Sequence, residues 1–379
     1  MDLGLNEEQE MLKTMARDFL VKECPKTLVS QLEEDEKGYS PELWRKMAEL
    51  GWMGLVLPEQ YGGTGSQFLD LCILLEETGR NIVPGPFFST VVLCASAILE
   101  GGTEEQKKQF LPRIANGDMI MAFALTEPSA TYEASGVATR AVASGNDYII
   151  NGTKLFVTDA HIADHMIVVA RTREGARVKP ENAMTLFLVD ARSRGIKCTL
   201  LKTIAADKQC EVILSDVRVP QKNMLGQVNK GWPIVEKVLE KATVGKCAEM
   251  VGGAQQVLDM TVSYAKERIQ FGRPIGSFQA IQHYCASMVT DVDGSRFTTY
   301  QAAWRVSQGL PAAREVAIAK AKVNDAYHRV TVLGHQIHGA IGFTKDHDMG
   351  LYYKRAKAAE VAFGDADYHR EKVAQALGL

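Results

Sequence analysis

Residues 267–282, ERIQFGRPIGSFQAIQ, hold the side chains best suited to bind a phosphorylated ligand. Residues 267–268 are expected to end a helix, Gly-Arg-Pro at 272–274 to break the chain, and Ser277 to cap the next helix. The turn would then display two guanidinium groups, which suit phosphate oxygens, and the ring of Phe271, which could cover adenine or isoalloxazine. A salt-bridged helical hairpin is the alternative interpretation of the same residues.

The elements that position this turn follow from changes of pattern along the chain. Residues 1–118 place apolar side chains at helical spacing, residues 119–228 form short β-rich runs, and residues 229–379 are helical again. Consecutive strands without intervening helices predict an antiparallel barrel or sandwich. The last part reads as four long helices of an antiparallel bundle, with breaks at 272–276, 309–311 and 339–342. The sequence therefore predicts a multi-domain α+β fold with an all-α domain, a β domain and a helical bundle.

Composition narrows the class of protein. The 379-residue chain carries a formal net charge of −3, which gives no general attraction to nucleic acid or anionic lipid. Its acidic N-terminus lacks the features of a signal peptide, and its longest weakly polar run, 87–99, is too short to span a bilayer. The seven cysteines occur without any CxxC pair, as suits reduced thiols. We expect a cytoplasmic protein with neither nucleic-acid nor membrane partners.

Two further patterns could bind ligands, but a structural role is favoured for both. His335 and His338 stand three residues apart at a predicted helix end, yet no carboxylate or thiol follows at a fitting spacing, so no metal is expected. The Gly-rich run 62–65 has no following lysine and no preceding strand, so it does not predict a phosphate loop.

Four other segments, each weak alone, form a linked set with the turn at 267–282. They are Gly102-Thr103-Glu104-Glu105-Gln106 with Leu111-Pro112, Ala124-Leu125-Thr126-Glu127-Pro128, Asn151-Gly152-Thr153-Lys154-Leu155-Phe156-Val157-Thr158, and Gln336-Ile337-His338-Gly339-Ala340. Together the five closely resemble the acyl-CoA dehydrogenase family, and the resemblance covers nearly the whole chain. Phe156 stands where that family usually has Trp, which keeps a flat apolar side chain.

The resemblance implies a fold, a cofactor and a reaction. In this family FAD takes a hydride from the β-carbon of an acyl-CoA thioester while a carboxylate removes the α-proton. Around the isoalloxazine ring, where N–H groups and hydroxyls stabilise developing negative charge, the resemblance places Leu125, Thr126, Phe156 and Thr158. On the pyrophosphate and adenosine it places Arg268, Phe271 and Gln279 of one subunit, with Gln336 and Gly339 of its neighbour. A shared cofactor implies at least a dimer, and the family is usually tetrameric, with an electron-transferring flavoprotein as acceptor.

The catalytic base is missing from both places where the family supplies it. The commoner place is a Glu late in the bundle, and counting without gaps from Gln336 brings that position to Phe363. The rarer is a Glu early in the first bundle helix, and counting back from Phe271 brings it to Ala242. Because neither side chain can accept a proton, the sequence leaves the catalytic residue unassigned.

Three acids lie near these two positions. Asp365 follows Phe363 by two residues, and Glu249 lies at least one turn past Ala242. Glu240 precedes Ala242 by two residues, which turns a helix by about 200° and points it elsewhere. We take Asp365 and Glu249 as weak candidates, with a solvated or capping acid as the competing interpretation. Position matters, since general-base catalysis is worth roughly 10²–10⁴-fold and depends first on geometry.

Two departures concern the ligands. After residues 124–128 the family commonly has a Gly-Ser-Asp turn, whereas this chain has Tyr132 and Glu133, whose bulk and charge argue against ordinary acyl-CoA binding. Asp365 and Asp367 stand where the family has uncharged polar groups near FAD phosphates, so their charge should weaken FAD binding in a homomeric site. One tightly held FAD per subunit in the chain purified alone would contradict this.

These observations favour one subunit of a heterotetrameric, FAD-dependent acyl-CoA dehydrogenase that α,β-desaturates an acyl-CoA, as in fatty-acid or steroid side-chain catabolism. In such pairs one chain carries the base, and the other completes the flavin site. Two alternatives stay open: an active homotetramer that uses a non-standard carboxylate, and a flavin chemistry that needs no base.

Overall fold

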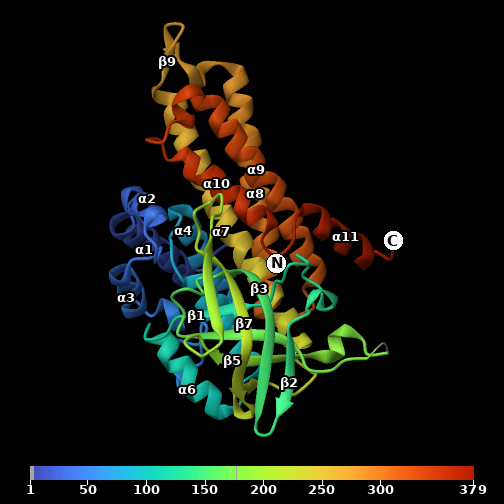
Figure 1. Cartoon of the computed structure of the whole chain (residues 1–379). Helices are drawn as coiled ribbons and strands as arrows, with labels where there is room; N and C mark the ends of the chain where they lie inside the picture. The colour runs from blue at the N-terminus through green and yellow to red at the C-terminus, as the bar shows by residue number, and fades with distance from the viewer. Residues whose placement is uncertain (1–3, 176) are drawn as a thin grey trace. The chain divides into compact units, whose positions relative to one another are not determined.

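The structure is a computed structural model that describes residues 4–175 and 177–379 (Figure 1). The chain forms two compact units. The first unit combines residues 4–31, 67–83 and 243–379, and the second combines 32–66 and 84–242. Both units therefore contain helices from the N-terminal third of the chain. The domain boundaries expected at residues 118 and 228 follow chain order and stay predictions.

The first unit is a helical bundle joined by two N-terminal helices. Its elements are α1 (Glu7–Glu23), α4 (Phe68–Asn81), most of α7 (Trp232–Glu267), α8 (Gln279–Ser307), α9 (Ala313–His338), α10 (Met349–Val361) and α11 (Ala366–Ala376). Figure 1 shows α7, α8 and α9 side by side, with the turn that carries β9 (Ile269–Gln270) at one end of the bundle. The expected fourth long helix is divided into α10 and α11 at residues 362–365, where Phe363 and Gly364 have φ values of 59° and 102°.

A buried carboxylate connects the N-terminal helices to the bundle. Glu76 on α4 accepts hydrogen bonds from Lys13 on α1 at 2.9 Å and from Tyr300 on α8 at 2.7 Å. Burial would raise the pKa of Glu76, but the charges of Arg296 and Lys13 more than offset this, so its pKa lies below the ordinary value. Because the buried Glu76 charge is paired only while α1 and α8 supply these partners, this network fixes the packing of α1, α4 and α8.

The second unit is built on one sheet of short strands. They are β1 (Met121–Ala124), β2 (Arg140–Ser144), β3 (Asp147–Thr158), β4 (His165–Arg171), β5 (Met184–Asp190), β6 (Ile196–Leu201), β7 (Gln209–Pro220) and β8 (Met224–Leu225), in the order β6-β7-β3-β2-β4-β5-β8 with β1 beside β4. Most pairs are antiparallel, as expected, but β4 pairs in parallel with β1 and with β2. The alternation of side chains along a strand carries no information about strand direction.

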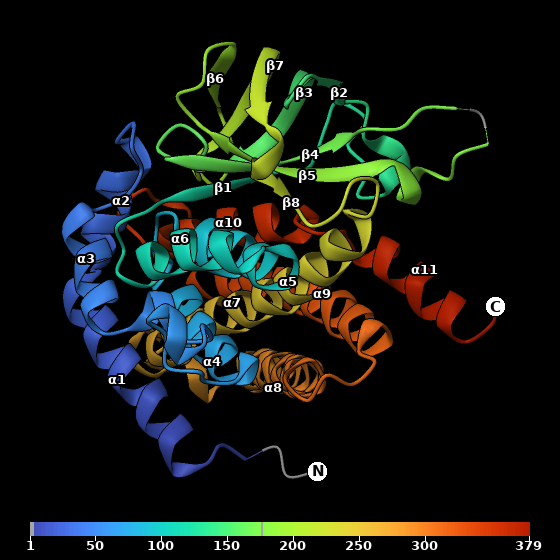
Figure 2. The same ribbon diagram turned by 90° about the horizontal axis from the view of Figure 1, so that it is seen from below.

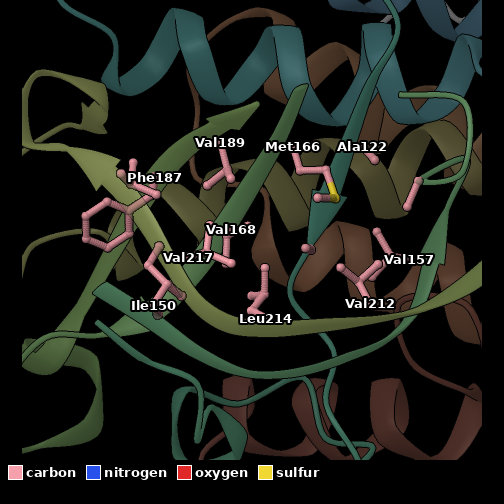
Figure 3. Close-up of a cluster of buried hydrophobic side chains, with 14 of the residues drawn as sticks. Ala122, Ile150, Val157, Met166, Val168, Phe187, Val189, Val212, Leu214 and Val217 are labelled. Atoms are coloured by element: carbon pink, nitrogen blue, oxygen red, sulfur yellow. The ribbon is translucent and has the colours of Figure 1, made fainter. Parts of the chain in front are cut away.

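The sheet folds over its own apolar face. Figure 2 shows β6, β7, β3 and β2 in one layer and β1, β4 and β5 in another. Their facing side chains form the buried cluster of Figure 3, in which Ile150 and Leu214 from the first layer meet Val168 and Phe187 from the second. The rings of Tyr148 and Phe187 lie 5.0 Å apart between centroids. This sandwich core packs β3 and β1 into the two layers of one domain.

Helices of the second unit support the sheet from outside. They include part of α2 (Lys26–Glu34), α3 (Pro41–Glu49), the π-helix η3 (Phe88–Ala95), α5 (Ser96–Gly101) and α6 (Glu104–Ala115). Gln106 on α6 donates to the Met224 carbonyl of β8 at 2.9 Å, and Thr90 on η3 accepts from the Met121 amide of β1 at 3.0 Å. Of the helices in 4–175 and 177–379, none is both long and apolar enough to cross a membrane.

Candidate active site

A buried ion pair orders the loop that follows β1. Lys154 on β3 has no exposed surface, and its ammonium donates to Glu127 at 2.7 Å and to the Leu125 carbonyl at 3.1 Å. The Glu127 carboxylate also accepts from the amides of Ala138 and Thr139, at 2.8 and 3.0 Å. Burial opposes ionisation of Glu127, but Lys154 and these donors hold its pKa below the ordinary value. The pair therefore fixes the backbone on both sides of Thr126.

The same loop meets β3, so the structure brings Leu125 and Thr126 against the strand that carries Phe156 and Thr158, the four residues expected around a flavin ring. The Leu155 amide donates to the Thr126 carbonyl at 2.8 Å. The pairing of β3 with β7 shifts register between Lys154 and Val157, and Phe156 at this bulge has a φ of 55°. Its ring is consequently 51% exposed, although Val157 beside it is buried. An exposed aromatic ring beside partly buried Thr126 and Thr158 is suited to a flat heterocycle.

The loop that departs from the family's Gly-Ser-Asp turn is folded on itself. Ser129 donates from its hydroxyl to the Gly136 carbonyl at 3.1 Å, and the Glu133 amide donates to the Thr131 hydroxyl at 3.2 Å. Tyr132 is half-buried and Glu133 is exposed. The loop thus forms a closed turn and displays a carboxylate rather than a serine hydroxyl.

At the end of the bundle, the turn after α7 is a small hairpin. Residues of β9 pair with β10 (Arg273–Pro274), and the ring of Phe271, with a φ of 53°, is 91% exposed at its tip. The guanidinium of Arg273 lies 4.2 Å from the centroid of the Phe278 ring. Arg268 is exposed, and within the described residues neither arginine has a carboxylate partner. Two unpaired guanidinium groups beside an exposed ring remain available for an anionic ligand with a flat ring.

The predicted cap of the helix after this turn was wrong. Helix α8 begins at Gln279 and its N-cap residue is Phe278, which makes no side-chain capping bond. Ser277 lies one residue too early, in the turn η7 (Ile275–Ser277), and its hydroxyl donates to the Pro274 carbonyl at 2.7 Å. The α8 N-terminus, with exposed Gln279, therefore keeps amide donors that no side chain caps.

Gln336 and Gly339 lie at the exposed end of α9, away from the hairpin in sequence but in the same unit. Gly339 ends the helix with a φ of 63°. The intervening His338 is buried, stacks on Tyr264 with centroids 4.4 Å apart, and directs Nδ1 at the Gly334 carbonyl, 2.8 Å away. His335 makes the corresponding bond to Thr331 at 2.9 Å. Both rings thus pack under the loop, and the described residues hold no cluster of three or more side chains suited to a metal ion.

Positions 242 and 363 have different surroundings. Ala242 on α7 is fully buried. Phe363 is half-buried in the loop between α10 and α11, and its carbonyl accepts from Nε2 of His369 at 2.9 Å. Gly364 has a left-handed backbone, and an added Cβ there would overlap the ring of Tyr368. The loop conformation is therefore closely specified even though Phe363 itself cannot accept a proton.

Two of the three neighbouring acids, Asp365 and Glu249, already make a structural contact. Asp365 is the N-cap of α11 and accepts from the Tyr368 amide at 2.8 Å. Glu249 forms an ion pair with Lys246 one turn before it on α7. Glu240 is half-buried, makes no hydrogen bond or ion pair with any other described residue, and has its pKa raised by burial despite the charges of Lys241 and Lys237. Of the three, Glu240 has the environment most typical of a general base.

The acyl-CoA dehydrogenase N-terminal, middle and C-terminal domain families match residues 6–118, 122–217 and 229–378. The chain belongs to the acyl-CoA dehydrogenase family. An acryloyl-CoA reductase (NADH) of Anaerotignum propionicum is 35% identical over 99% of this chain and 95% of its own length. The solved butyryl-CoA dehydrogenase of Megasphaera elsdenii has a TM-score of 0.93 at 32% identity and covers 100% of both chains. A chain of the ChsE4–ChsE5 complex from Mycobacterium tuberculosis has a TM-score of 0.91 at 29% identity, over 100% of this chain and 99% of that one.

Membership confirms the three-part fold expected from the sequence and the class of enzyme. The chain is an oxidoreductase of the flavoprotein family whose members act on the carbon–carbon bond of acyl-CoA thioesters. The roles expected for individual residues, and for FAD itself, stay predictions.

A second buried lysine, which sequence reasoning missed, holds the chain just before Phe363. Lys320 on α9 is fully buried, and its ammonium donates to Asn324 at 2.6 Å and to the Ala359 carbonyl at 2.9 Å, near the end of α10. Burial lowers its pKa to about 8. The sequence signal for this role is the position of Lys320 within the apolar stripe Val316, Ala319 and Val323. A lysine on a buried helix face needs hydrogen-bond partners, since an unpaired lysine is almost never fully buried.

Proposed function

We propose that this chain is the FAD-clamping subunit of a heteromeric acyl-CoA dehydrogenase, whose partner subunit supplies the base for α,β-desaturation. One observation carries the proposal: side chains suited to a flavin are retained in both units, whereas positions 242 and 363 hold Ala242, fully buried, and Phe363. An acyl-CoA α-proton needs a positioned acceptor, and neither side chain can be one.

The residues present fit FAD. In the second unit the Thr126 loop is held by the Lys154–Glu127 pair and bonded to Leu155, next to an exposed Phe156 ring. Bound there, FAD would supply the hydride acceptor. The ordered backbone and hydroxyl of Thr126 would stabilise negative charge developing on the ring, without reorganisation during the reaction.

Diphosphate recognition is proposed for the first unit. Arg268 and Arg273 are exposed and lack carboxylate partners within the described residues, and the uncapped α8 N-terminus follows the same hairpin. Exposed Gln336 and Gly339 would contact the adenosine of a neighbouring subunit's FAD. The ring of Phe271 at the hairpin tip is 91% exposed and leaves a flat apolar surface open to a ligand or partner chain.

The contacts of the acids near positions 242 and 363 favour a base supplied by a partner subunit over a substitute base within this chain. Asp365 serves as a helix cap and Glu249 is paired with Lys246, so each would lose a structural contact by taking a proton. Asp367, whose charge should oppose FAD phosphates, is paired with Arg370 at 2.7 Å, but both side chains are exposed and the pair is therefore weak. One similar structure is a complex of two named proteins, ChsE4 and ChsE5, which is consistent with assembly from two chains.

A second candidate is an active homotetramer with Glu240 as the base. The observation that favours it is the half-buried carboxyl of Glu240, with a raised pKa and no bonded partner within the described residues. A carboxylate with a raised pKa takes up a proton more readily at neutral pH.

Two preparations separate these candidates: the chain alone, and the chain co-expressed with the product of the adjacent gene. FAD per chain is measured by absorbance, and catalysis by bleaching of the flavin with a series of acyl-CoAs, including bulky ones. We expect little FAD and no bleaching for the chain alone, and both in the co-purified complex. Full bleaching by the chain alone would overturn the heteromer, and its loss in Glu240→Gln would then identify the base.

The remaining partners follow from the family. The acyl-CoA is the proposed substrate, and an electron-transferring flavoprotein is the proposed acceptor. Re-oxidation of the bleached complex by a purified electron-transferring flavoprotein, compared with re-oxidation by NAD⁺, tests the acceptor directly. Faster re-oxidation by NAD⁺ would exclude it.

A further inference from the structure

Two thiols meet at the edge of the sheet in the second unit. Cys198 lies on β6 and Cys210 on β7, and the register pairs Cys198 with Val212 and Leu200 with Cys210. Directly paired residues share a face of the sheet, so the two cysteines are diagonal neighbours on one face. The register therefore places the two side chains next to each other on that face.

A histidine completes this cluster. Nδ1 of His161 lies 3.8 Å from the sulfur of Cys210, and its Nε2 lies 3.2 Å from the Lys37 carbonyl oxygen. The carbonyl can only accept, so Nε2 carries the proton and Nδ1 presents its lone pair to Cys210. The ring is therefore placed to take a proton from that thiol.

The two thiols differ in access and in acidity. Cys198 is exposed, whereas Cys210 is buried. The neighbouring Cys210 thiol lowers the pKa of the Cys198 thiol, while the same contact and burial raise the pKa of Cys210. A solvent-borne oxidant would reach Cys198 first, and Cys198 is also the thiol more readily ionised.

We propose that Cys198 and Cys210 are a site of reversible oxidation by hydrogen peroxide, closing an intramolecular disulfide. The Cys198 thiolate attacks one peroxide oxygen and breaks the O–O bond, which gives a sulfenic acid and releases hydroxide. Cys210 then transfers its proton to Nδ1 of His161 and attacks the Cys198 sulfur, which expels the second hydroxide. In sum, two thiols and one peroxide give one disulfide and two waters.

The sheet can accommodate this closure. Diagonal neighbours are typically about 7–8 Å apart between Cα atoms, slightly more than the roughly 4.4–6.8 Å of a disulfide. Strand β6 is at the end of the sheet order and, among the described strands, pairs only with β7, so closure would displace an edge strand without breaking a second ladder. Edge strands are the part of a sheet least constrained by pairing.

The disulfide would also lie next to the segment assigned to the flavin. Cys210 pairs with Val157 of β3, between Phe156 and Thr158. Oxidation should therefore restrict the motion of β7, which pairs with the flavin-facing segment of β3. This consequence rests on the proposed function, but formation of the disulfide does not.

The test oxidises the purified full-length chain with a stoichiometric amount of hydrogen peroxide, alkylates the remaining thiols and maps the peptides. We expect a linked Cys198–Cys210 peptide, loss of two of the seven free thiols, and full recovery with dithiothreitol. Cys210→Ser should instead accumulate a sulfenic acid at Cys198 that dimedone labels, and His161→Gln should slow closure by about tenfold.

Cys285→Ser is the matched control, because Cys285 is a partly exposed thiol on α8 and should not change the yield of the linked peptide. The proposal is overturned if wild type and Cys210→Ser reach the same sulfenic or higher oxide of Cys198 at equal rates without a linked peptide. A change of flavin absorbance that accompanies closure in the FAD-loaded complex would show that the disulfide affects the flavin site. Closure without such a change would support the disulfide and contradict only its effect on the flavin.

Discussion

Lys154 and Lys320 are both fully buried, and burial lowers the pKa of each to about 8. The loops that these two lysines hold nevertheless differ in the residues that they carry. Lys154 has a carboxylate partner, Glu127, and the loop it orders keeps the family's flavin motif. Among the described residues Lys320 is bonded only to Asn324 and backbone carbonyls, and the loop beyond it holds Phe363, at the position where the sequence predicts the family's base. On the proposed function, both loops keep the lysine that holds them, and only the loop at Phe363 has lost a proton acceptor.

The largest expected effect comes from restoring a carboxylate at position 363. If Lys320 still holds the loop in a productive shape, Phe363→Glu should increase acyl-CoA-dependent bleaching by the chain reconstituted with FAD by roughly 10²–10⁴-fold. The φ of 59° is equally unfavourable for Phe and Glu, so the backbone adds no new cost. Phe363→Gln is the control for polarity. Equal bleaching in the two variants would mean that the loop geometry is lost together with the base.

Breaking the ion pair of the intact region should have the next largest effect. Lys154→Met leaves the Glu127 carboxylate buried without its cation and is expected to cost about 3–5 kcal/mol in the free energy of unfolding, measured by denaturant titration. Lys154→Met combined with Glu127→Gln should recover part of this loss, because no uncompensated charge remains. If the double variant is no more stable than the single one, the pair is not the source of the stability.

This contrast also shows what the sequence could reveal. The α–β–α order and the meeting of the Thr126 loop with Phe156 were predictable, because apolar periodicity and local motifs encode them. The roles of Lys154 and Lys320 were not, because the burial of a lysine depends on strands and helices distant in sequence. The cap of α8 was misassigned to Ser277 because the turn before it uses one more residue than the sequence suggested.

Acid should destabilise the loop at Phe363 through His369. His369 is buried, Nε2 donates to the Phe363 carbonyl, and its Nδ1 has no hydrogen-bond partner within the described residues. Burial lowers its pKa to about 4, against 6.5 ordinarily, with Lys320 and Lys372 adding to the shift and Asp365 opposing it. Since the unfolded chain binds the extra proton between these values, stability should fall as the pH drops from 6.5 to 4, by up to about 3 kcal/mol.

The measurement compares wild type with His369→Gln, which keeps an amide donor for the Phe363 carbonyl but does not titrate. The difference in unfolding free energy between the two should narrow as the pH falls if wild type is the more stable at pH 7. A difference that is constant from pH 7 to 4 would assign the acid sensitivity to other groups.

The smallest expected effect distinguishes a capping acid from a catalytic one. Asp365→Ala removes the acceptor for the Tyr368 amide at the start of α11 and should cost about 1 kcal/mol of stability. Asp365→Asn keeps the cap and should leave stability unchanged. If a partner subunit supplies the base, neither substitution should reduce bleaching in the co-purified complex. Loss of bleaching in Asp365→Asn at unchanged stability would make Asp365 the base, and the loop held by Lys320 would then be as functional as the one held by Lys154.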